Sequence, residues 1–277
     1  MKIWLWGSAA NERIPAMFCK CGACELARQR GGKYIRTQAQ ALVDDHLLID
    51  FGQDTFHHSL TYDYDFTRLR DILITHAHPD HLAHRELENT WSYYAHNDMD
   101  TIHVHGGEEC GELIATLATK KVDFILIAPF ETQRIGDYTV TALPAEHGTR
   151  TPLCYIVSDG MKTILYNHDT RLYQNRAVYE FIRSRGFCFD AVICDGTGCL
   201  QSIRHGSRHM TLYHNLLLRG RLSSLGALSE GCVWVVTHFS HNGLRHADGR
   251  AATQEELDAI AARENIVFGY DGLTLTL

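Results

Sequence analysis

Residues 71–81 read Asp71-Ile72-Leu73-Ile74-Thr75-His76-Ala77-His78-Pro79-Asp80-His81, an apolar run followed at once by three histidines and a carboxylate. An apolar run ahead of a proline predicts a strand that ends in a loop. Neutral imidazoles suit Zn²⁺, Mn²⁺ or Fe²⁺, and a carboxylate compensates the charge of the cation. The chain has 18 histidines, so a solvated histidine-rich loop is the alternative. We interpret the loop as a divalent-metal site.

Further metal ligands are expected where other strands end. In a fold built on sheets, strand ends gather at one rim, and the loops there carry the chemistry. A single histidine after a strand is more often structural, but several such residues together with the first loop predict one centre. The candidates are His147 after the run 138–143, Asp169 after 163–166 and His238 after 232–237.

In order and spacing, these residues resemble the ligand series of the metallo-β-lactamase superfamily, over almost the whole chain. The resemblance implies an α/β fold of the αββα sandwich type with two metals at one edge. It also implies the ligands of each metal: His76, His78 and His147 for one, Asp80, His81 and His238 for the other, with Asp169 as the bridge.

A second cluster, Cys19-Lys20-Cys21-Gly22-Ala23-Cys24, lies near the N-terminus. Three thiolates at this spacing suit a tetrahedral Zn²⁺ site, which needs a fourth ligand. Three ordinary reduced cysteines are the alternative. A disulfide is disfavoured because nothing in the sequence indicates secretion.

The cysteine cluster makes the chain resemble the phosphoribosyl cyclic phosphate phosphodiesterases of the carbon–phosphorus lyase pathway. In that group a similar cluster is joined to a late histidine of a Thr-His-x-x-His segment, which here is Thr237-His238-Phe239-Ser240-His241. The resemblance implies that His241 is the fourth ligand of a structural zinc, together with Cys19, Cys21 and Cys24.

Composition limits the class of protein. With 277 residues and 45% hydrophobic residues, the chain can form a single domain, 1–277, with one large core. A net charge of -7 disfavours a general nucleic-acid binder but allows a small anionic substrate, because metals supply positive charge. No secretory or membrane-spanning stretch is apparent. Nine cysteines suit a reducing compartment, so we expect a cytoplasmic protein, with a homodimer possible.

Turn and capping signals outline the elements. Two hairpins are predicted, one over 41–50 and one over 152–166 with Asp159-Gly160 at its turn. Helices are expected at 172–185 and, from a capping box of Thr253 and Glu256, to about residue 264. Residues 266–277 are predicted to form two short strands, and the two sheets are expected to come from different halves of the chain.

The segment 84–100 contains Trp91, Tyr93 and Tyr94 just after the metal loop. A helix or lid that covers the site and bounds a sugar or base pocket is one interpretation. Ordinary packing of an amphipathic helix is the other.

The expected chemistry is hydrolysis by a metal-activated hydroxide, since two metals can share a water and polarise a phosphoryl oxygen. Asp80 would hold a metal and help orient the nucleophile. By its position in the phosphodiesterase resemblance, His209 is the candidate general acid; a surface histidine that opens a helix is the alternative. Asp195 could orient a ligand histidine or cap a loop. The candidate phosphate contacts are Arg36, Arg134 and Arg204.

The leading hypothesis is a dinuclear metal phosphodiesterase that acts on a small cyclic phosphate ester. A thioester, lactam or nucleotide-ester hydrolase of the same fold is the alternative enzyme. A non-catalytic carrier, as among cofactor-biosynthesis relatives with a similar cysteine cluster, is the third hypothesis. The full ligand set favours an enzyme.

Overall fold

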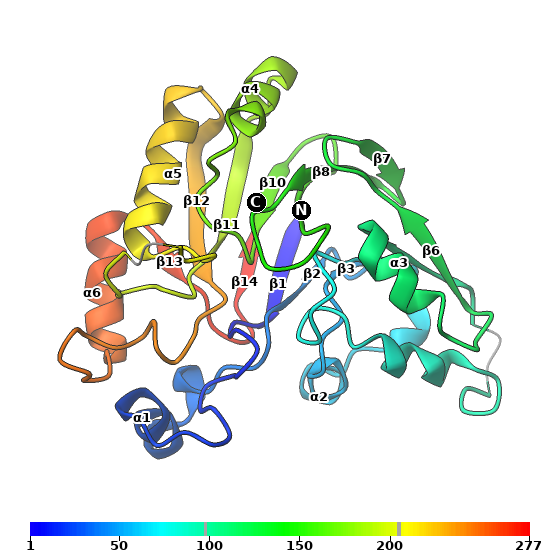
Figure 1. Cartoon of the computed structure of the whole chain (residues 1–277), viewed down its shortest axis with the longest axis horizontal. Coiled ribbons are helices and arrows are strands. Elements are labelled where there is room, and N and C mark those ends of the chain that lie inside the picture. Colours follow the sequence, from blue (N-terminus) through cyan, green and yellow to red (C-terminus); the bar gives the residue numbers. More distant parts are fainter. Residues whose placement is uncertain (97–98, 204–205) are drawn as a thin grey trace.

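The computed structural model describes residues 1–96, 99–203 and 206–277. Within these residues two seven-stranded sheets form the centre of the molecule (Figure 1). The first has the order β14-β1-β2-β3-β4-β5-β6. Its strands are β1 (Lys2–Gly7), β2 (Gln40–Val43), β3 (Leu47–Ile49), β4 (Asp71–Leu73), β5 (Ile102–Gly106), β6 (Val122–Leu126) and β14 (Thr274–Thr276).

The second sheet has the order β13-β12-β11-β10-β9-β8-β7. Its strands are β7 (Thr132–Ile135), β8 (Tyr138–Pro144), β9 (Leu153–Ser158), β10 (Thr163–Asn167), β11 (Phe189–Asp195), β12 (Leu228–Thr237) and β13 (Val267–Phe268). The α-helices are α1 (Gly22–Arg30), α2 (Thr55–Thr61), α3 (Glu108–Ile114), α4 (Arg176–Arg185), α5 (Leu212–Ser224) and α6 (Gln254–Glu264). Short 3₁₀ turns occur at η1 (Gly32–Tyr34), η2 (Phe66–Arg68) and η3 (His84–Thr90).

Three apolar layers hold these elements together. The middle layer joins the facing sides of the two sheets, with residues such as Leu5 and Val43 against Val140 and Tyr155. A second layer packs α4, α5 and α6 on the outer face of the second sheet, and a third packs α3 on the first. Figure 1 shows α5 and α6 on one side of the paired sheets and α3 on the other. The predicted αββα sandwich is confirmed.

Both predicted hairpins are confirmed, as β2–β3 and β9–β10. The helix predicted at 172–185 begins only at Arg176, because the side chain of Asn175 accepts a hydrogen bond from the amide of Ala177 and caps the helix there. The capping box of Thr253 and Glu256 is present at α6.

The last two strands belong to different sheets, which the sequence did not indicate. β13 pairs with β12 in the second sheet, whereas β14 pairs with β1 in the first. The sheets therefore come from different halves of the chain, as predicted, except that the C-terminus returns to complete the first sheet. None of the helices in the described residues is long and apolar enough to cross a bilayer.

Strand direction brings several loops to one edge of the sandwich. Strands β8, β10, β11 and β12 all run the same way, so their carboxyl ends lie at one edge of the second sheet. Two hydrogen bonds tie the end of β4 to that edge: the Leu153 amide donates to the Thr75 carbonyl (2.8 Å) and the Tyr155 hydroxyl to the Ile74 carbonyl (2.6 Å). The loop after β4 therefore faces the loops of the second sheet.

Candidate metal centre

One group of ligand atoms converges between the loops after β4, β8 and β10. Nε2 of His76 lies 2.9 Å from Nδ1 of His78, which in turn lies 3.2 Å from Nε2 of His147. Oδ2 of Asp169 is 3.2 Å from Nε2 of His76. The ligand atoms of the four residues all lie within 4.8 Å of one another, close enough to hold one cation.

A second group lies beside the first and shares Asp169. Nε2 of His81 lies 3.2 Å from Nε2 of His238 and 3.2 Å from Oδ2 of Asp80. Oδ2 of Asp169 is 3.1 Å from the same nitrogen of His81. The structure thus brings together the seven residues predicted as rim ligands, in the two sets that were predicted, with Asp169 common to both.

The donor atoms suit divalent cations. Asp169 is 3% exposed, and its Oδ1 is a buried atom without a hydrogen-bond partner. Burial, with the repulsion of His81 added, lowers the pKa of His76 to about 3, so its imidazole is neutral, the form that binds metal. The neutral imidazole of His76 beside the carboxylate of Asp169 is a donor pair that a divalent cation stabilises.

Hydrogen bonds behind the ligands fix which nitrogen faces the centre. Oδ2 of Asp50 accepts from Nδ1 of His81 (2.8 Å), and Oγ1 of Thr197 accepts from Nδ1 of His238 (2.9 Å). Oγ1 of Thr75 lies 3.1 Å from Nδ1 of His76 and itself donates to Asp50 (2.9 Å). With Nδ1 holding the proton, each Nε2 presents its lone pair to the centre.

Backbone strain is concentrated at the same place. Asp50, Asp169 and His238 have φ angles of +67°, +46° and +61°, in the left-handed region that residues other than glycine rarely adopt. Surrounding packing must hold these conformations, and such strain is typical of functional sites.

His209 lies next to the two ligand groups, in the loop before α5. Its Nδ1 donates to Oδ2 of Asp195 (3.0 Å) and lies 3.1 Å from Oδ1 of Asp169. Burial opposes the charge of His209, but Asp195 and Asp169 outweigh it and raise its pKa to about 11. Asp195 therefore orients His209 rather than one of the predicted ligands. Asp169, Asp195 and His209 also lie close enough together to hold a cation themselves.

The cysteine cluster forms a separate site beside α1, which lies below the sheets in Figure 1. Nδ1 of His241 lies 3.6 Å from Sγ of Cys19, 3.2 Å from that of Cys21 and 3.5 Å from that of Cys24. All nine cysteines lie within the described residues and are free thiols. Three sulfurs around one imidazole nitrogen match the donor set of a structural zinc.

The family model for the beta-lactamase superfamily domain matches residues 46–227, about two thirds of the chain. The chain belongs to the beta-lactamase superfamily. The sequence-based prediction of this family, and of the metal-dependent hydrolase that it implies, is confirmed at that level. No curated protein matches the chain.

Solved structures agree with this superfamily fold. Zn²⁺-bound PqqB from Methylobacterium extorquens has a TM-score of 0.71 at 17% identity, covering 100% of both chains. A diphosphatase of the PhnP family has a TM-score of 0.72 at 17% identity, covering 100% of this chain and 97% of the other. Human tRNase Z, short form, has a TM-score of 0.61 at 14% identity, covering 100% and 99%.

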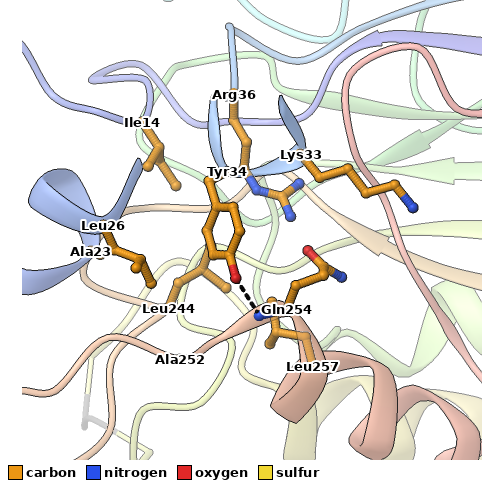
Figure 2. Close-up of a pocket in the computed structure, with 10 residues that line it drawn as sticks. All are labelled: Ile14, Ala23, Leu26, Lys33, Tyr34, Arg36, Leu244, Ala252, Gln254 and Leu257. Atoms are coloured by element: carbon orange, nitrogen blue, oxygen red, sulfur yellow. Dashed lines mark hydrogen bonds between the residues drawn. The ribbon is translucent and has the colours of Figure 1, made fainter. Parts of the chain in front are cut away.

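Of the three arginines predicted to contact phosphate, the structure describes two, and neither lies at the metal centre. Arg36 is buried, donates to Ser8 Oγ (2.9 Å) and the carbonyl of Gly269, and lines a small cavity beside Tyr34 and Gln254 (Figure 2). Arg134 is exposed on β7, where it donates to the Gly136 carbonyl (3.0 Å). Both predictions are wrong, and Arg204 lies outside the described residues.

The aromatic segment 84–100 is described except at residues 97–98. It begins with the 3₁₀ turn η3, in which Leu87 is buried. Trp91, Tyr93 and Tyr94 contact one another, with centroids 5.4–5.8 Å apart, and are 46%, 71% and 58% exposed. None of these three rings contacts a described ligand residue, so the structure does not support a lid made of them.

Sequence reasoning missed Asp50, Thr75 and Thr197. Asp50 directly follows the strand β3, so the rule that found the other ligands applied to it as well. Thr75 and Thr197 carried no such signal, because hydroxyl groups next to histidines are common and only the fold shows where they point.

Proposed function

We propose that this chain is a dinuclear metal-dependent phosphodiesterase that hydrolyses a small cyclic phosphate ester. The arrangement around Asp169 supports this proposal most strongly. Both predicted ligand sets share this carboxylate. A cationic His209 lies beside it and belongs to neither predicted set. Phosphoryl transfer needs positive charge around the phosphorus and a proton for the leaving oxygen, and this arrangement supplies both.

The residues of the site would have different roles in the reaction. His76, His78 and His147 would hold one cation, Asp80, His81 and His238 the other, with Asp169 between them. Bound there, two divalent cations would lower the pKa of a water and withdraw charge from a phosphoryl oxygen. Asp80 also orients the attacking water. His209, held through Nδ1 by Asp195, turns Nε2 toward the substrate and protonates the leaving alkoxide.

Charge supports a small phosphate ester as the substrate. Asp50, Asp80, Asp169 and Asp195 carry four negative charges, one fewer than two divalent cations and a protonated His209 would provide, so the loaded centre would attract an anion. The net charge of -7 on the chain disfavours a long nucleic acid. Similarity to a PhnP-family diphosphatase agrees with phosphate chemistry.

The test combines metal analysis with a substrate screen. Elemental analysis of protein reconstituted with Zn²⁺ or Mn²⁺ should give about three metals per chain, two at the rim and one at the cysteines. The screen compares cyclic phosphate esters, a chromogenic acyclic phosphodiester and a chromogenic lactam. Turnover of the phosphates that disappears on chelation and in Asp169→Asn supports the proposal. Turnover of the lactam alone, or of nothing by protein with full metal content, would refute it.

A further inference from the structure

The strand β6 is an open edge of the first sheet. In the described residues it pairs only with β5, in parallel, and its other side has no neighbouring strand. The amide of Ile102 donates to the carbonyl of Lys121, and the amide of Ile127 donates to that of Gly106. Because backbone groups alternate between the two sides of a strand, these bonds show that the odd-numbered residues of β6 face β5. Figure 1 shows β6 at the edge of the sheet, beside α3.

The even-numbered residues of β6 therefore direct their backbone groups away from the sheet. Val122 and Phe124 each present an amide and a carbonyl that no hydrogen bond engages in the part of the chain that the structure describes. At Leu126 the open edge ends, because its carbonyl accepts a hydrogen bond from Nε2 of Gln133 (2.8 Å). An unpaired row of donors and acceptors is a template for another extended chain.

A groove with a volume of about 620 Å³ lies along this edge, between β6 and α3. Its apolar lining includes Ile114, Leu117 and Leu126, and the side chain of Leu126 is 52% exposed. The ring of Phe124 lies against α3, since a Cβ placed on Gly111 would be 2.5 Å from its Cε1. Side chains alternate between the two faces of a strand, so every second side chain of an added strand would enter this groove.

Charge at the groove favours a basic partner. Its lining includes three acidic residues, Glu108, Glu112 and Asp123, and one basic residue, Lys120. Glu108 and Asp123 are exposed and form no ion pair within the described residues. A lysine side chain could lie along the apolar lining and bring its ammonium group to these carboxylates. A second copy of this chain would instead bring like charges together, which disfavours pairing of β6 with itself.

We propose that β6 and α3 form a docking site for an extended basic peptide of another protein. The peptide adds a strand to the first sheet through the open amides and carbonyls of Val122 and Phe124. Since β6 has five residues, the bound segment has about five to seven. The inference is independent of the proposed hydrolysis, because no predicted metal ligand lines the groove.

Peptide binding to the full-length, metal-loaded protein tests the proposal. The probe is a labelled, end-blocked peptide, Lys-Val-Lys-Thr-Lys-Val-Lys, and fluorescence anisotropy measures its Kd. We expect saturable binding of one peptide per chain that weakens as salt rises. A version with Glu in place of each Lys, and a version N-methylated at the three central residues, should both bind at least about tenfold more weakly. The N-methylated peptide keeps every side chain and loses only backbone donors.

Variants of the edge separate backbone pairing from charge. Val122→Pro removes one outward amide, which an edge strand tolerates because that amide has no partner, and should weaken binding at least about tenfold. Val122→Thr keeps the amide and should change Kd by less than about threefold. Glu108→Gln combined with Asp123→Asn should weaken binding about two- to tenfold. Glu230→Gln, on β12 of the second sheet, removes an exposed charge elsewhere and should have no effect. Tm and metal content are measured for each variant.

Amide hydrogen exchange followed by NMR locates the bound peptide. The amides of Val122 and Phe124 should exchange rapidly in the free protein and slow down on binding. Equal binding of the Lys and Glu peptides, or binding that leaves both amides unprotected, overturns the proposal. A dimer in light scattering that Val122→Pro dissociates would assign the edge to a second copy and also overturn it. If Val122→Pro does not fold, the N-methylated peptide decides, and its binding as tightly as the parent peptide refutes strand addition.

Discussion

Replacement of His209 by alanine tests the chemical step most directly. The imidazole donates through Nδ1 to the buried Asp195, whose carboxylate stabilises the protonated ring. Its Nε2 makes no hydrogen bond within the described residues and can donate to a leaving oxygen. A sugar alkoxide needs that proton, whereas a nitrophenolate leaves as a stable anion.

The expected magnitude follows from these contacts. General acid catalysis contributes about 10²–10⁴-fold, or about 2.7–5.4 kcal/mol of barrier, so His209→Ala should slow a cyclic sugar phosphate by that factor. A nitrophenyl phosphodiester should slow by less than about tenfold.

Asp195→Asn gives a matched variant that keeps the ring in place. The amide would donate to Nδ1 and leave a neutral imidazole, a weak acid, so this variant should show the same selective loss. The acid form of His209 is lost as pH rises. The alkaline limb of the pH–rate profile should therefore lie at lower pH in Asp195→Asn than in the wild type, because the variant lacks the carboxylate that raises the pKa of His209.

The assay is steady-state kinetics on both substrates across pH, with metal content measured for each variant. If both substrates slow equally while both rim metals remain, His209 positions the substrate and is not an acid. If a rim metal is lost, His209 is a ligand, which the proximity of Asp169 and Asp195 would allow.

Three further outcomes are expected. Cys21→Ser should lower Tm by about 5 °C or more in a thermal melt, since a structural zinc contributes folding free energy, and an unchanged Tm would rule that zinc out. Asp50→Asn should weaken metal binding by about 10- to 100-fold in a chelator competition, because Asp50 fixes the proton of His81; unchanged affinity would contradict this. Burial lowers the pKa of His58 to about 4, so the unfolded chain binds the proton more readily below pH 6.5. The free energy of unfolding, measured with denaturant, should therefore fall by up to about 3 kcal/mol between pH 6.5 and 4, and less in His58→Gln.

The predicted ligands were accessible from sequence because their signal is local. Each follows an apolar strand, and strands that run the same way end at the same edge, so His147, Asp169 and His238 could be assigned to one place before the fold was known. The two hairpins were predictable for a similar reason, since turn residues act within a few positions.

Properties that depend on distant packing were not predictable. Arg36 and Arg208 are both arginines in loop-rich segments, yet one is buried beside Ser8 and the other is exposed beside Gly148. The start of α4 depends on which residue caps it, and the sheet joined by β14 depends on the edge left open by β1. Neither the burial of an arginine, nor the first residue of a helix, nor the sheet that a terminal strand joins produces a periodic pattern in the sequence.

The segment 237–241 connects the two groups of candidate metal ligands. His238 faces the rim and His241 faces the cysteines, while Phe239 between them is fully buried. The backbone of Phe239 bonds to Ser8 and Ala10, and the guanidinium of Arg36 stacks on its ring at 4.7 Å. Phe239 and its neighbours therefore fix where both histidines point, including the strained φ of His238. A zinc that holds His241 would restrain the same segment from its other end, and the cysteine site would then stabilise the geometry of the predicted rim ligand His238 without taking part in the reaction.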